Sequence, residues 1–211
     1  MTPWSRNWLR RIRTMEEEIR YFLECAHKTA AAGLLSCSSG NLSLRCKGQD
    51  NKDCALLSAT GSWLGELQED QVALCRISDG TSLNGVHPTM EAGFHLGTMR
   101  KRPEVGCVLH FQSPYATVVA CMKDKPADFN VTLEGPLYVG REVPVVPFLP
   151  PGSPELAAAV VEALTAHDIV LMSNHGQVAC GPDFPDTFRR AVFFEMACRI
   201  IVLSRGNCTT V

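Results

Sequence analysis

Two short and almost continuous apolar runs limit the folds open to this chain more than any other feature. They cover residues 105–112 and 169–172, and each leads into polar residues. Strands that are apolar on both faces must be covered on both faces, because exposed apolar surface costs about 25 cal/mol per Å². The sequence therefore predicts an α/β fold in which helices cover a central sheet.

The rest of the chain supplies the elements of such a fold. Apolar residues recur at steps of three and four between residues 15 and 35, which predicts a helix that Gly33 ends. Four more helices are predicted, over residues 89–101, 114–122, 153–166 and 186–204, and a short acidic helix is predicted within residues 63–84. Further strands are predicted over residues 42–45, 55–58, 72–77, 143–146 and 177–179. With 211 residues and no repeat or linker, the chain is expected to form one domain.

Composition and charge argue against several classes of function. A net charge of −2 gives no field for binding nucleic acid, and no apolar run is long enough for a membrane-spanning helix. The ten cysteines form no CxxC pair and several lie in apolar runs, which favours reduced thiols in a cytoplasmic protein. Residues 1–14 contain four arginines and no acid. We interpret them as a basic extension ahead of the domain, with a transit peptide or a membrane-surface segment as the alternative.

Two polar side chains leave the same face of the first apolar run. His110 and Gln112 are two residues apart, and alternate residues of a strand point to the same side. Buried polar groups need partners, so an apolar strand that delivers two of them to one point indicates a site. The alternative from spacing alone is a core histidine beside an edge glutamine.

A third candidate, His175, lies in the loop that follows the second apolar run. Loops on a rigid scaffold often carry function, which makes this position suitable for a site. The alternative is an ordinary turn residue.

Glu91 is a candidate acid at the start of a predicted helix. We expect it in the first turn, with Thr89 as N-cap, where the helix dipole favours an ionised carboxylate by about 0.3–1 kcal/mol. The alternative is a helix-start acid without a chemical role. His95 follows four residues later on the same face and is expected to pack beneath the site, whereas His87 is expected to be a loop residue.

Three backbone positions are suited to binding an anion. The turns Ser39-Gly40-Asn41 and Thr60-Gly61 each place N–H groups beside a short polar side chain, and the helix start at Thr89 offers more. Together they would suit one phosphate.

Taken in order, these segments resemble the class II aldolase family from about Met15 to Arg205. No single segment is specific, but the ordered set is. The matching segments are Ser39-Gly40-Asn41-Leu42-Ser43-Leu44-Arg45, Leu57-Ser58-Ala59-Thr60-Gly61, Pro88-Thr89-Met90-Glu91 with His95, Arg102-Pro103-Glu104-Val105 leading to His110, Ser113-Pro114-Tyr115-Ala116-Thr117, Gly152-Ser153-Pro154-Glu155-Leu156-Ala157, and Asn174-His175-Gly176.

The resemblance implies a single α/β domain over residues 15–211, with a central, mostly antiparallel sheet between helix layers. It also implies a homotetramer with the site between subunits. Members of the family hold zinc with three histidines, of which His110 and His175 match two, while Gln112 stands at the third position. Glu91 matches the catalytic acid. The phosphate cradle maps onto Asn41, Thr60, Gly61 and Thr89, with Met90 in place of a serine.

The reaction implied is cleavage of a ketose phosphate to dihydroxyacetone phosphate and an aldehyde, through a metal-stabilised enediolate. Glu91 would act as general acid and base. In the family a tyrosine from a neighbouring subunit protonates the departing aldehyde. Tyr138 is a weak candidate for that role, and Tyr115 is expected to pack instead.

Because Gln112 stands where the family has a histidine, the sequence leaves alternative metals and alternative functions open. An amide oxygen suits Mn²⁺ or Mg²⁺ better than Zn²⁺, so the sequence predicts weaker zinc binding or use of a harder ion. Met90 removes a hydroxyl from the predicted cradle. The chain could therefore be a sugar-phosphate decarboxylase, epimerase or dehydratase that uses the same metal–enediolate chemistry, or a non-catalytic scaffold similar to the adducin head.

Overall fold

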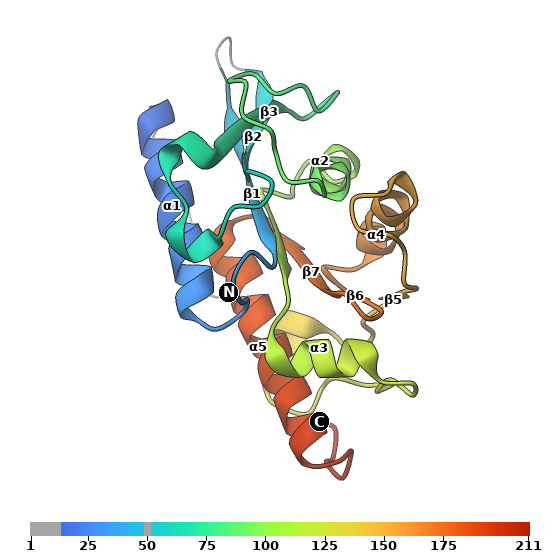
Figure 1. Cartoon of the computed structure of the whole chain (residues 1–211). Coiled ribbons are helices and arrows are strands. Elements are labelled where there is room, and N and C mark those ends of the chain that lie inside the picture. Colours follow the sequence, from blue (N-terminus) through green and yellow to red (C-terminus); the bar gives the residue numbers. More distant parts are fainter. Residues whose placement is uncertain (1–13, 49–51) are drawn as a thin grey trace, which may run out of the picture.

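A seven-stranded sheet forms the centre of the structure, a computed structural model that describes residues 14–48 and 52–211 (Figure 1). The strand order is β3-β2-β1-β4-β7-β6-β5, and every neighbouring pair is antiparallel except β5 and β6. This confirms the predicted fold class. The strands are β1 Asn41–Lys47, β2 Asp53–Ser58, β3 Val72–Arg76, β4 Cys107–Phe111, β5 Val145–Val146, β6 Ile169–Met172 and β7 Gly176–Gly181.

Helices cover both faces of the sheet, and the sheet separates the core into two halves. One half of the core includes Phe22 and Phe194, from the helices on one face. The other half includes Phe94 and Val160, from the α2 and α4 pair that lies on the opposite side of the sheet in Figure 1. The helices are α1 Met15–Ala31, α2 Ala92–Lys101, α3 Pro114–Cys121, α4 Pro154–Ala166 and α5 Phe184–Leu203.

Several helices begin where a polar side chain satisfies the free N–H groups of the first turn. Thr14 and Glu17 form a reciprocal capping box at the start of α1. Ser153 accepts a hydrogen bond from the backbone of Leu156 in α4, and Asp183 does the same for Asp186 in α5. The basic extension predicted for residues 1–14 lies, apart from Thr14, outside the described residues.

The predicted start of the helix at residues 89–101 was wrong. The helix α2 begins at Ala92, and Glu91 occupies the N-cap position with φ −95° and ψ 11°. The cause is a pairing with β2, because the backbone N–H of Thr89 donates to the carbonyl of Ser58 at 2.9 Å. Thr89 is therefore held against the end of β2, and the helix begins only after it.

Where one short acidic helix was predicted, the structure has two 3₁₀ helices, η2 Leu64–Glu66 and η3 Glu69–Gln71. The π-helix η4 Gly135–Val139 was not predicted.

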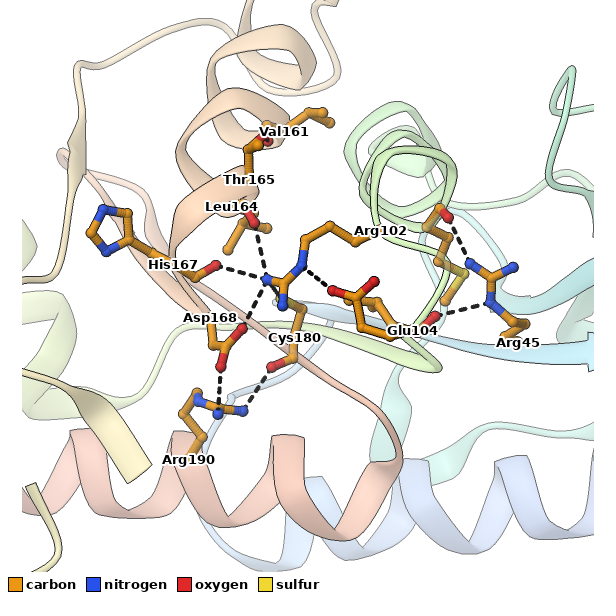
Figure 2. Close-up of polar contacts among 12 residues, drawn as sticks. Arg45, Arg102, Glu104, Val161, Leu164, Thr165, His167, Asp168, Cys180 and Arg190 are labelled. Carbon is orange, nitrogen blue, oxygen red and sulfur yellow. Dashed lines mark hydrogen bonds and ion pairs between the residues drawn. The ribbon is translucent and has the colours of Figure 1, made fainter. Parts of the chain in front are cut away.

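A charged network fixes the end of the sheet at which β6 begins (Figure 2). Asp168 accepts from Arg102 and from Arg190, each at 2.8 Å, and so joins the end of α2 to α5. Arg102 also donates to the backbone carbonyls of Leu164 and His167 at 3.0 and 3.1 Å. His175 follows the opposite end of β6, so this network anchors the scaffold away from that loop.

The ten cysteines, all among the described residues, form no disulfide, and seven of them are buried. Burial raises the pKa of Cys46 and of Cys180 to about 12, so these thiols stay protonated and unreactive. None of the helices in the described part of the chain combines the length and apolar character that a membrane span requires.

Candidate metal and substrate site

Glu91, His110 and His175 meet at one point. Each offers one ligand atom, and these three atoms all lie within 4.8 Å of one another. Glu91 comes from the start of α2, His110 from β4 and His175 from the turn between β6 and β7. The structure therefore brings together the acid and both histidines that the sequence predicted for the site.

Side chains along β4 point alternately to the two faces of the sheet, and this alternation directs His110 into the site. Cys107, Leu109 and Phe111 belong to the core half under α1, α3 and α5, whereas Val108 belongs to the half under α2 and α4. His110 shares the face of Val108 and so points toward α2. The same face of the neighbouring strand carries Asn41, which is the direct register partner of His110.

The turn that carries His175 packs closely against the end of β4. Asn174 adopts a left-handed backbone conformation, with φ 55°, which turns the chain tightly before β7. A Cβ atom on Gly176 would lie 2.7 Å from the carbonyl oxygen of Phe111 and 3.0 Å from Cε1 of His110. Glycine is therefore required for β7 to start this close to the histidine.

The contacts of His110 turn its Nε2 atom toward a carboxylate. A backbone carbonyl only accepts, so Nδ1 of His110 donates its proton to the carbonyl of Gln177 at 2.9 Å. In the neutral ring, Nε2 is then a lone pair, 3.5 Å from Oε2 of Glu91. Nε2 of His175 lies 3.5 Å from the other oxygen, Oε1. The two imidazole rings approach edge to face, with centroids 4.9 Å apart.

The donor set fits a divalent cation. Oε1 of Glu91 and Nδ1 of His175 are buried and have no hydrogen-bond partner, although buried polar atoms are normally satisfied. A cation among the three side chains would give Oε1 its missing partner and separate the facing lone pairs. Two imidazoles and a carboxylate suit Zn²⁺, and also Mn²⁺ or related ions.

Burial also keeps His175 in the form that binds metal. Burial lowers the pKa of His175, the neighbouring His110 lowers it further, and Glu91 acts in the opposite direction. A lowered pKa favours the neutral imidazole, which is the ligand form of histidine.

Gln112 lies at the end of β4 beside these ligands. A Cβ atom placed on Gly176 would lie 2.8 Å from Cγ of Gln112 and 3.0 Å from Cε1 of His110, so both side chains lie against the start of β7. The backbone N–H of Gln112 donates to the carbonyl of Leu34 at 3.1 Å, which holds this end of the strand. The role of Gln112 as a ligand stays a prediction.

The segments predicted to bind phosphate are also adjacent. Ala59 pairs with Pro88, and the N–H of Thr60 donates to the carbonyl of His87 at 3.3 Å. Thr60 and Gly61 are exposed, Gly61 has a left-handed φ of 72°, and Thr89 is buried. Their role in binding phosphate stays a prediction, and Met90, at 64% exposure, occupies the next position.

Asn41 contacts Glu91 and His95, and its role in binding phosphate stays a prediction. Its Nδ2 donates to Oε2 of Glu91 at 2.9 Å, and its Oδ1 lies 2.5 Å from Nε2 of His95. His95 is fully buried beneath the site, and its Nδ1 lies 2.7 Å from Oγ of Ser43. Ser43 was not among the predicted site residues. The alternation of Asn41 and Ser43 on one strand face would have been the signal for it.

The ring of Tyr138, the weak candidate for the acid, and that of Tyr115, which was expected to pack, both contact α5. Tyr138 stacks on Phe193 at 5.1 Å between centroids, and Arg199 lies 5.5 Å from the centre of the Tyr115 ring.

Comparison with known proteins places this geometry in a family. Residues 20–202 match the model of the class II aldolase and adducin N-terminal domain. The chain belongs to this family. The match covers each of the side chains that form the site.

Relatives within the family carry out more than one reaction. The chain is 31% identical to a 3-oxo-tetronate 4-phosphate decarboxylase from Haemophilus influenzae over 80% of this chain and 79% of the relative. It is 29% identical to an L-fuculose phosphate aldolase from Methanococcus maripaludis over 75% and 81% of the two chains. The solved structure of YgbL from Klebsiella pneumoniae superposes with a TM-score of 0.82 and 26% identity, over 94% of each chain.

Proposed function

We propose that this protein is a divalent-metal-dependent lyase that decarboxylates a small phosphorylated 3-oxo sugar acid. The observation that carries the proposal is the buried contact in which Nε2 of His110 faces Oε2 of Glu91 at 3.5 Å, with Oε1 unpartnered. Together with His175, these side chains form a buried set of two imidazoles and one carboxylate that could hold a divalent cation. The decarboxylase from Haemophilus influenzae, at 31% identity, supports the class of substrate.

His110, His175 and Glu91 would hold the cation, with Gln112 as a fourth ligand at the end of β4. A bound divalent cation would supply Lewis-acid stabilisation of the negative charge that develops on the substrate oxygens. Because Gln112 contributes an amide oxygen, we expect Mn²⁺ or Mg²⁺ to compete with Zn²⁺ more effectively than in a site of three histidines.

Glu91 is proposed to move the proton, and its unpartnered Oε1 is the atom free to do so. The carboxylate accepts the proton of the substrate hydroxyl on C2. The C1–C2 bond then breaks, its electron pair forms the C2–C3 double bond of an enediolate, and carbon dioxide leaves. Glu91 returns the proton to C2, and solvent supplies a second proton to oxygen. The product from 3-oxo-tetronate 4-phosphate is dihydroxyacetone phosphate.

The phosphate group is proposed to bind where the loops of Thr60, Gly61 and Thr89 meet. The exposed hydroxyl of Thr60 and the exposed, left-handed Gly61 backbone there suit a phosphate oxygen. The Asn41 amide already bonds to Glu91 and His95, so we propose that it orients the acid and does not bind phosphate.

Aldol cleavage of a ketose phosphate, with release of an aldehyde, is the second candidate. The relationship to L-fuculose phosphate aldolases favours it. That reaction requires a second acid–base group for the departing aldehyde, whereas carbon dioxide leaves without one. Decarboxylation therefore needs fewer acid–base groups than the aldol reaction.

The test compares two substrates and two readouts. Protein purified without chelator is analysed for metal and is then supplied with 3-oxo-tetronate 4-phosphate or with L-fuculose 1-phosphate. Carbon dioxide and aldehyde are measured separately, because both reactions release dihydroxyacetone phosphate. Carbon dioxide from the first substrate is expected. Aldehyde from the second without carbon dioxide from the first would support the aldolase instead, and absence of metal and of both products would indicate a scaffold.

The variant Glu91→Gln tests the proton transfer. Glutamine keeps the shape and can still accept the Asn41 hydrogen bond, but it cannot accept and return the proton. We expect kcat to fall by roughly 10²–10⁴-fold while KM changes only a few-fold. The control is His87→Ala, at an exposed position, which should keep wild-type kcat. Wild-type turnover in Glu91→Gln would remove this residue from the mechanism.

A further inference from the structure

A series of hydrogen bonds links Glu91 to the protein interior. Asn41 donates to Oε2 of Glu91 at 2.9 Å, Nε2 of His95 contacts Oδ1 of Asn41 at 2.5 Å, and Nδ1 of His95 contacts Oγ of Ser43 at 2.7 Å. The three residues behind the carboxylate are all buried, and His95 has no exposed surface. This series lies on the side of Glu91 away from its unpartnered oxygen.

The direction of every hydrogen bond in the series follows from the carboxylate. An ionised carboxylate only accepts, so the amide nitrogen of Asn41 must face it and the amide oxygen must face His95. Nε2 of His95 therefore carries a proton and donates it to that oxygen. Nδ1 is then a lone pair, which accepts from the hydroxyl of Ser43. The alternative acceptor for this hydroxyl, the carbonyl of Val108, is farther away at 3.5 Å.

The surroundings of His95 agree with a neutral ring. Burial, followed by the nearby His110, lowers the pKa of His95 to about 3. The ring also stacks on Phe94, with centroids 4.8 Å apart, which fixes its plane. A neutral imidazole in a fixed plane has one N–H and one lone pair in set directions, and so it distinguishes the two ends of the Asn41 amide.

We infer that His95 is a positioning residue, which acts through Asn41 to hold Oε2 of Glu91 and leave Oε1 for the cation and the proton. The inference rests on the proposed function. Without His95, the Asn41 amide has two nearly equivalent orientations, since its terminal torsion is broadly two-fold. In one of them the amide oxygen would face the carboxylate and displace it. A hydrophobic residue would fill the same space without a buried polar series, so packing alone does not require this histidine.

The test is a double-mutant cycle read out as Mn²⁺ affinity by titration calorimetry. His95→Leu is expected to weaken Mn²⁺ binding by roughly 10–100-fold, the usual range for residues that orient metal ligands. His95→Gln can keep an N–H near the Nε2 position and should restore most of the affinity. If His95 acts through Asn41, His95→Leu should have little further effect in an Asn41→Ala background.

The matched control is Thr98→Val in the same helix, which replaces a buried hydroxyl that has no hydrogen-bond partner. It should leave Mn²⁺ affinity unchanged, and thermal unfolding should show that all variants are folded. Full and additive losses from His95→Leu and Asn41→Ala would show that the histidine does not act through the amide. Loss of affinity in His95→Gln equal to that in His95→Leu would also overturn the inference.

A second measurement is independent of metal and of turnover. Long-range ¹H–¹⁵N correlation spectra of the wild-type protein report which ring nitrogen carries the proton. We expect His95 to be neutral with its proton on Nε2. A proton on Nδ1, or a charged ring near pH 7, would refute the series even if the protein binds Mn²⁺. If His95 has the expected tautomer but the protein does not bind Mn²⁺, the proposed function is refuted and the hydrogen-bond series is not.

Discussion

The two oxygens of Glu91 have different surroundings, and this asymmetry defines the site at the scale of single residues. Oε2 accepts from Asn41, whereas Oε1 is buried without a hydrogen-bond partner. A hydrogen bond to one oxygen stabilises the anion, while the other oxygen retains its capacity to bind a cation or a proton. One carboxylate can therefore serve as ligand and as acid–base group.

Gln112→His tests the cation preference at the same scale. An imidazole nitrogen suits Zn²⁺ better than an amide oxygen, so zinc affinity should rise by at least about tenfold, or about 1.4 kcal/mol. Competition with a chromophoric chelator measures this. Gln68→His adds a histidine at an exposed position and controls for non-specific binding. Unchanged zinc affinity in Gln112→His would mean that the side chain at position 112 does not reach the cation.

The burial of neutral His95 should make stability depend on pH. The unfolded chain binds a proton on this ring below about pH 6.5, whereas the folded protein resists protonation down to about pH 3. Protons are therefore taken up on unfolding between these values, so stability falls as the pH drops below 6.5. By pH 5 this contribution should reach about 2 kcal/mol.

Urea unfolding at pH 7.5 and pH 5.0 measures that contribution as the difference between wild type and His95→Gln. Glutamine does not titrate, so the variant should lose about 2 kcal/mol less than wild type on acidification. Equal losses in the two proteins would contradict a buried neutral ring at this position.

At the scale of elements, the site depends on how closely the start of β7 approaches the end of β4. A Cβ on Gly176 would meet the backbone of Phe111 at 2.7 Å and the side chain of Gln112 at 2.8 Å. A backbone atom cannot move without shifting the strand, because protein interiors are close-packed. The separation of these two strands therefore sets the position of His110 relative to His175.

Gly176→Ala should push the two strand ends apart and weaken Mn²⁺ binding by about tenfold or more, since small displacements of ligands cost affinity steeply. Gly181→Ala is the matched control at the other end of β7. Its Cβ would be equally crowded, 2.8 Å from Oγ1 of Thr187, beside the Arg190 network shown in Figure 2. It should lower thermal stability but keep Mn²⁺ affinity within about threefold. Equal loss of affinity in both variants would indicate general damage.

The elements that the sequence could predict are those with a local signal. Apolar runs gave the strands that carry His110 and precede His175, and Ser153 with Pro154 gave the start of α4. The start of α5 was predicted at Asp186, whereas the helix begins at Phe184. The start of α2 was missed because it depends on Thr89 pairing with Ser58, a contact between distant segments. The π-helix η4 has no periodic pattern of its own. Likewise, the Asn41–His95 contact crosses 54 positions and could not be inferred from either residue alone.

At the scale of the whole molecule, the three ligands join three separate parts of the fold. The start of α2, the end of β4 and the turn after β6 are far apart along the chain and meet only in the folded protein. The predicted homotetramer and cytoplasmic location stay predictions at this scale. An unfolded chain has no such set of ligands, so cation binding and folding should be coupled.

Mn²⁺ should therefore stabilise the whole domain. At a free concentration of about 100 times Kd, binding adds about 2.7 kcal/mol to the free energy of unfolding. In a domain of this size 1 kcal/mol raises Tm by roughly 2–4 °C, so Mn²⁺ should raise Tm by about 5–10 °C relative to protein in EDTA. Differential scanning calorimetry measures the shift. His110→Ala should abolish it, because one of three ligands and the orienting bond to Gln177 are lost. His87→Ala, which alters an exposed histidine outside the triad, should keep it. A Tm shift of equal size in His110→Ala and wild type would place the cation elsewhere on the protein. If Mn²⁺ does not shift the Tm of the wild type, Glu91, His110 and His175 do not form a site for this ion.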